Sequence, residues 1–130
     1  MAVDLKSPQQ QVFDAVFLAS YLLGYRTVDF LPPKDYTMPF VYVGEYFDQD
    51  RRTKDLLYGN MQLTLHIYHD YKKRRELTTM MDKLKVECRK LKQTENFYLT
   101  FKNITSRTLI DTSTGEPLLH GIIEVEFQFH

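Results

Sequence analysis

Strict alternation of apolar and polar residues between Met61 and Tyr68 is the feature that most constrains the fold of this chain. Successive side chains on a β-strand point to opposite faces, so one face of such a strand is apolar and the other polar. The apolar face carries Met61, Leu63, Leu65 and Ile67, and the other carries Gln62, Thr64, His66 and Tyr68. The pattern predicts a strand over Gly59–His69, in a sheet with one buried face and one face open to solvent or a partner.

The same alternation recurs in residues 118–129 and predicts a C-terminal β-hairpin. Residues 104–111 form its first arm, and the turn residues of Thr112–Pro117 separate the two arms. In the second arm, one face is Ile123, Val125, Phe127 and Phe129, and the other is Ile122, Glu124, Glu126 and Gln128.

Three other segments favour extended structure because they are rich in β-branched and aromatic residues. They are Phe40–Phe47, with Gly44 as a candidate β-bulge, Phe97–Lys102, and a possible short strand at Thr27–Phe30. Residues 48–55 contain no apolar side chain, and we expect them to form an exposed, mobile loop that contacts a partner. Its candidate contact residues are Asp48, Asp50, Arg51, Arg52, Lys54 and Asp55.

Two helices are predicted from apolar residues at helical spacing. The first spans Pro8–Leu23, because Ser7 and Gln10 form a capping box at its start and Gly24 follows its end. The second spans about Glu76 to Leu91, with an apolar seam that packs on the sheet. The seam residues are Leu77, Met81, Leu84, Cys88 and Leu91.

The chain of 130 residues has the length of one domain with one core. We therefore expect a single α+β domain over residues 1–130, in which two main helices pack on an antiparallel or mixed sheet that ends in the C-terminal hairpin.

Composition restricts the partners and the compartment. Seventeen basic residues balance seventeen acidic ones, so no overall field attracts the chain to nucleic acid or to a membrane. The apolar stretch Val12–Leu23 is too short to span a bilayer, and it lacks the pattern of a signal peptide. The single cysteine, Cys88, fits a reducing cytoplasm, and its place on the helix seam predicts a buried, inert thiol.

No pattern predicts catalysis, a metal or a cofactor. His66 and His69 would point to opposite faces of a strand, so they could share a metal ion with Asp70 only if the strand ended between them. The carboxylates of the 48–55 loop alternate with arginine and lysine, which compete with a cation. No phosphate-binding loop, nucleophile elbow or zinc-protease motif occurs in the sequence.

Charge is segregated along the chain. Residues 72–92 hold nine basic and three acidic side chains, whereas residues 111–129, including Glu124 and Glu126, hold four acidic side chains and no lysine or arginine. The basic run is Lys72, Lys73, Arg74 and Arg75. It precedes a helix start, where cations are disfavoured, so it is a solvated turn, a contact with another subunit, or a contact with nucleic acid.

The polar face of the Gly59–His69 strand is a second candidate contact surface. Tyr58, His66 and Tyr68 place amphipathic side chains there, and tyrosine is favoured in protein contacts. The alternatives are plain solvent exposure or a nucleic-acid-binding module, in which Tyr68 and Tyr71 stack on bases beside the basic run.

The segment Met38-Pro-Phe-Val-Tyr-Val-Gly-Glu45, the polar excursion, the alternating strand and the following helix resemble the tail-completion and tail-terminator proteins of long-tailed bacteriophages. The resemblance covers about residues 8–129 and is best over 38–91.

This resemblance implies a subunit that assembles with copies of itself into a ring, commonly sixfold, at the head-proximal end of the tail tube. Its further partners would be the tail-tube protein and the head-connector proteins, and its location the virion. Such proteins end tube polymerisation and join the tail to the head. The basic segment 72–92 and the acidic last strand are then candidates for the two complementary faces that close a ring.

Overall fold

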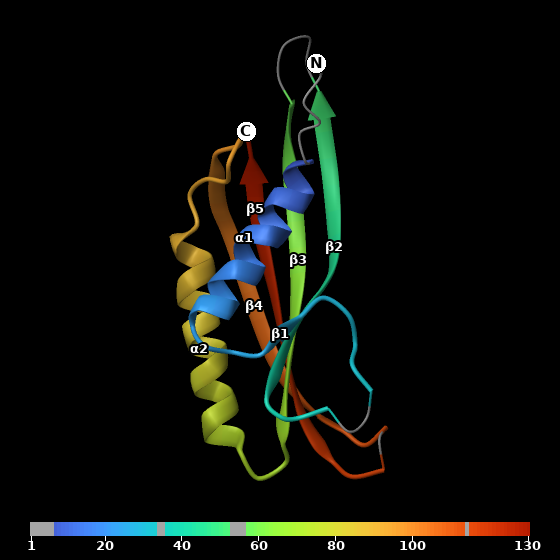
Figure 1. Ribbon diagram of the computed structural model, residues 1–130. Coiled ribbons are helices and arrows are strands. Elements are labelled where there is room, and N and C mark those ends of the chain that lie inside the picture. The colour runs from blue at the N-terminus through green and yellow to red at the C-terminus, as the bar shows by residue number, and fades with distance from the viewer. Residues whose placement is uncertain (1–6, 34–35, 53–56, 114) are drawn as a thin grey trace, which may run out of the picture.

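Two helices lie on one face of a five-stranded sheet in the computed structural model, which describes residues 7–33, 36–52, 57–113 and 115–130 (Figure 1). The protein is therefore α+β, as predicted. In chain order the elements are α1 (Pro8–Leu22), β1 (Thr27–Val28), β2 (Phe40–Arg52), β3 (Leu57–Asp70), α2 (Arg74–Lys90), β4 (Leu99–Asp111) and β5 (Leu118–Phe129). Within the described residues, no helix is both long and apolar enough for a membrane span.

The sheet is mixed, with strand order β1-β2-β3-β5-β4. The short β1 runs parallel to β2, and the remaining neighbours pair antiparallel. The hairpin of β4 and β5 is confirmed, and so is the short strand after α1. Although β5 follows every other strand in the chain, it lies between β3 and β4.

The prediction of a loop over residues 48–55 was wrong for residues 48–52. These residues continue β2 to Arg52 and pair with the start of β3, as in Asp48 with Met61 and Asp50 with Gly59. The backbone ladder needs no apolar side chains, and the partner strand supplies the hydrogen bonds. Lys54 and Asp55 lie outside the described residues.

The prediction of two separate strands at Phe97–Lys102 and Ile104–Asp111 was also wrong, because residues 99–102 and 104–111 belong to one strand, β4, which begins at Leu99. The register on β5 shifts between Phe101 and Asn103, as at a β-bulge. A bulge inserts one residue into the strand and inverts the alternation, which makes one strand look like two in the sequence.

The two helices differ in how their first turns are capped. The Oγ of Ser7 accepts a hydrogen bond from the Gln10 backbone N–H at 3.1 Å, and Pro8 opens α1, as predicted. The other half of the predicted capping box does not form, because the Gln10 side chain donates to Oδ1 of Asp14 at 2.8 Å. By contrast, α2 begins at Arg74, two residues before the expected start, and its N-cap Lys73 provides no side-chain cap. Backbone bonding from Leu77 to the Lys73 carbonyl carries the helix into the basic run.

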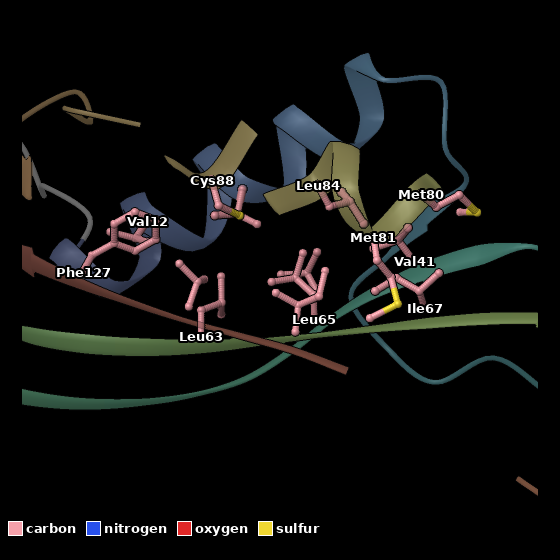
Figure 2. Packing of buried hydrophobic residues seen from close by; sticks show 14 of the residues in the cluster. Val12, Val41, Leu63, Leu65, Ile67, Met80, Met81, Leu84, Cys88 and Phe127 are labelled. Carbon is pink, nitrogen blue, oxygen red and sulfur yellow. The ribbon is translucent and has the colours of Figure 1, made fainter. Parts of the chain in front are cut away.

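The core lies between the helices and the sheet (Figure 2). Leu84 and Cys88 of α2 face Leu63 and Leu65 of β3, and all four are buried. Burial raises the pKa of the Cys88 thiol to about 12, so it stays protonated. This agrees with an inert core cysteine.

Candidate functional site

The open face is the side of the sheet opposite α1 and α2 (Figure 1). Its residues alternate with core residues along β3 and β5, so the strand register fixes which side chains meet there. The structure brings five predicted contact residues to this one face: Tyr58, His66, Tyr68, Glu124 and Glu126.

A continuous stack of rings crosses the open face from β2 to β5. Tyr68 is stacked between two neighbours, with ring centroids 5.1 Å from Phe40 and 4.3 Å from His120. His120 in turn lies 5.0 Å from His66, and the His66 ring stacks on Tyr42 at 5.4 Å. Such offset contacts stabilise the face beyond the area that they bury.

A chain of polar contacts runs through this stack. The Nδ1 atom of His66 lies 2.8 Å from Nε2 of His120, and Nε2 of His66 lies 3.2 Å from Oε2 of Glu45. The register of β2 on β3 shifts between Val43 and Tyr46, which confirms the bulge predicted at Gly44. A Cβ at Gly44 would lie 3.1 Å from the His66 ring, so glycine admits the close approach of that ring.

The environment changes the acidity of these groups. Burial alone would raise the pKa of the Glu45 carboxyl, but hydrogen bonds from its own backbone and from His66 lower it below its ordinary value. Burial, and next the neighbouring His66, lower the pKa of His120. Burial and the nearby Asp111 carboxylate raise the pKa of the Tyr68 hydroxyl. At neutral pH the face therefore combines carboxylates with a neutral His120.

His66 and His69 lie on opposite sides of the sheet, as the strand period predicted. His69 is buried on the helix side, where its Nδ1 accepts a hydrogen bond from the Asp70 backbone N–H at 2.7 Å. Its Nε2 lies 3.0 Å from Oε2 of Glu76, without the alignment of a hydrogen bond. In the described part of the chain, no three His, Cys, Asp or Glu side chains converge as metal ligands.

Of the predicted 48–55 contact residues, Asp48 lies on the helix side of the sheet. Its carboxylate accepts a hydrogen bond from the Gln9 side chain of α1 at 2.6 Å. For Asp50, Arg51 and Arg52 the structure describes the backbone pairing with β3. The paired residues 51–52 of β2 and 57–58 of β3 extend past the end of β5, because the β5 register stops at the pair of Gly59 and Phe129.

The basic run lies where the chain turns from β3 into α2, at one end of the sheet (Figure 1). Its side chains are all exposed, and among the described residues none of them forms an ion pair or a hydrogen bond. The four residues are Lys72, Lys73, Arg74 and Arg75. The run and the acidic strand β5 are thus separate surfaces of one chain.

Sequence reasoning missed two members of the open-face cluster, Glu45 and His120. They come from strands far apart in the sequence, and only the register of three strands places them around His66. The available signal was the candidate bulge at Gly44, which turns Glu45 toward the open face.

The comparisons with known proteins add a shared fold. No protein-family model matches the sequence, and no curated protein matches it. Among 15 matching chains of solved structures, one comes from a structure described as the virion of a native gene transfer agent particle. The match has a TM-score of 0.58 and 12% sequence identity, and it covers 94% of this chain and 95% of that chain. At this identity the likeness shows the fold.

Proposed function

We propose that this chain is a structural subunit of a virion, which caps the head-proximal end of a tail tube as a ring and joins the tail to the head. The observation that carries the proposal is a fold shared with a chain of a virion over nearly the full length of both. The order of elements, which resembles that of tail-completion proteins, supports the finer role.

The distribution of charge supports ring formation. Two different complementary surfaces on one subunit form a head-to-tail contact, which gives a ring when the rotation between neighbours closes. The open face carries the carboxylates of Glu45, Glu124 and Glu126, and the exposed basic run lies on another part of the same chain. In the proposed ring, the basic run of one copy binds the open face of the next.

The remaining contacts are with proteins of the tail and head. The described ends of β2 and β3, at Arg52 and Leu57, lie at one end of the sheet, and the ends of β4 and β5, at Asp111 and Leu118, lie at the other (Figure 1). In the proposed assembly they contact the tail-tube protein or the head-connector proteins, because neither is needed for the core.

A charge-exchange experiment tests the ring contact. The variant Arg74→Glu/Arg75→Glu and the variant Glu124→Arg/Glu126→Arg should each weaken self-association by at least about tenfold, because like charges then face each other. A mixture of both variants should associate again, since each variant's run then meets a face of opposite charge. Sedimentation velocity measures the species, and Lys83→Glu, an exposed charge on α2 outside the run, is the matched control.

Two results would contradict this contact: variants that associate like the wild type, or a mixture that stays dissociated. The capping role needs a separate measurement in the particles themselves. Tails assembled without this protein should be abnormally long by electron microscopy, and tails of normal length would exclude a terminator.

Of the two tyrosines that the nucleic-acid alternative uses to stack on bases, Tyr68 does not fit that role. Both faces of the Tyr68 ring are occupied, by Phe40 and by His120, so this ring does not offer a stacking surface for a base. Tyr71 beside the basic run is 50% exposed and stays available. Binding that falls steeply with salt in a gel shift would favour this alternative over the ring.

A further inference from the structure

The contacts of the histidine pair define where its protons lie. When both imidazoles are neutral, each ring has one N–H and one acceptor nitrogen. The Glu45 carboxylate beside Nε2 of His66 holds the His66 proton on that atom. Nδ1 of His66 is then an acceptor, and it receives a hydrogen bond from Nε2–H of His120 at 2.8 Å. One proton therefore lies between Glu45 and His66, and one lies between His66 and His120.

We propose that Glu45, His66 and His120 form a binding site for one proton, and that this proton controls the association of the open face with the basic run of a second copy. The second half of this inference rests on the ring contact proposed above. The first half concerns the folded subunit alone.

The proton balance follows from the geometry. An added proton binds Nδ1 of His120, and the proton on Nε2 of His120 moves to Nδ1 of His66. The positive charge then lies on His66, beside the Glu45 carboxylate. A second proton would place two N–H groups against each other across 2.8 Å, with both rings charged, so the pair accepts one proton and excludes the next.

Other groups around the pair modify its charge without sharing the proton. Tyr42 of β2 and Tyr68 of β3 stack on the imidazoles. From β4, the Arg107 guanidinium disfavours the protonated form of His120, and the Asp111 carboxylate favours it. Glu124 of β5 accepts a hydrogen bond from the Gln62 side chain at 2.8 Å.

Protonation makes this surface a poorer receptor for cations. The unprotonated site presents the Glu45 carboxylate, which is 66% exposed, to an approaching lysine or arginine. The protonated site neutralises that charge with an imidazolium. If the contact requires the unprotonated site, linkage dictates that association weakens about tenfold for each pH unit below the transition.

An NMR titration of the full-length chain tests the proton site. Imidazole ¹⁵N shifts of His66 and His120 should change in one common transition that takes up a single proton. Glu45→Gln should move the common transition to lower pH and leave His130 unchanged, because the carboxylate that stabilises the charge is gone. Two independent transitions, or an unchanged midpoint in Glu45→Gln, would overturn the site.

Sedimentation equilibrium at a series of pH values tests the control of association. The logarithm of the association constant should rise with pH at a slope of about one below the transition and level off above it, and His66→Gln/His120→Gln should remove this slope. A slope that persists in the double variant overturns the control. If the wild type does not associate at neutral pH, the ring contact and its control both fail, whereas the titration still decides the proton site.

Discussion

The two faces of the sheet differ in how they are buried. On the helix side, the side chains of Leu63, Leu65 and Phe127 are fully buried beneath α1 and α2. On the open face, Ile122 and Thr64 are also buried, although both helices lie on the other side of the sheet. The same strands thus specify the core with one set of alternate residues and present a cohesive, charged surface with the other.

The largest expected difference between the faces is in stability. Phe127→Ala should lower the free energy of unfolding by about 3–5 kcal/mol, because it removes a fully buried ring and leaves a cavity under the helices. Gln128 follows Phe127 in the chain and lies on the open face, so Gln128→Ala should change the free energy of unfolding by less than about 0.5 kcal/mol. Urea denaturation measures both, and comparable losses would mean that the open face is part of the core.

A smaller difference in stability is expected between alanine substitutions at two glycines on opposite faces of the sheet. A Cβ at Gly59 would overlap the Gln49 backbone carbonyl and crowd Phe129, so Gly59→Ala should cost about 1–3 kcal/mol. At Gly44 the nearest atom belongs to the His66 imidazole, which can move. Gly44→Ala should therefore cost less and should shift the His66 NMR signals. An equal cost at both positions would contradict this difference in packing.

The smallest expected effect is the pH dependence that the open face adds to stability. His120 has a lowered pKa in the folded chain, so the unfolded chain binds the proton more readily. This contribution is complete above the pKa of an unfolded histidine, roughly 6.5, and is lost as the pH falls through the folded value. His120→Gln should reduce the change in melting temperature between about pH 7.5 and 5. His130→Gln is the control, and an unchanged profile in His120→Gln would assign the dependence to other groups.

Most of the buried residues between the helices and the sheet could be predicted from the sequence. The two-residue period of the strands and the helical spacing of α2 alone determine which side chains face the core. The alternation in β3 and β5 and the seam of α2 gave the buried residues directly, as for Leu63, Phe127 and Leu84. The extent of β2 and the continuity of β4 could not be predicted, because polar residues can pair through the backbone and a bulge reverses the alternation.

The open face was predictable only in part. His66 and Tyr68 were recognised because they lie on one alternating strand. Their contacts with Glu45 and His120 depend on the pairing of β2, β3 and β5, including the register shift after Val43. Side-chain chemistry visible on one strand says little about which groups the neighbouring strands bring to it.

The position of β5 in the sheet determines when the protein can fold. Pairs such as Gly59 with Phe129 join distant parts of the chain, so a long loop closes before the central strands gain their hydrogen bonds. Until β5 enters between them, β3 and β4 present unpaired edges that other chains can bind. Shorter stretches of this chain therefore lack a complete sheet, and folding waits for the strand that comes last in sequence to take its place near the middle.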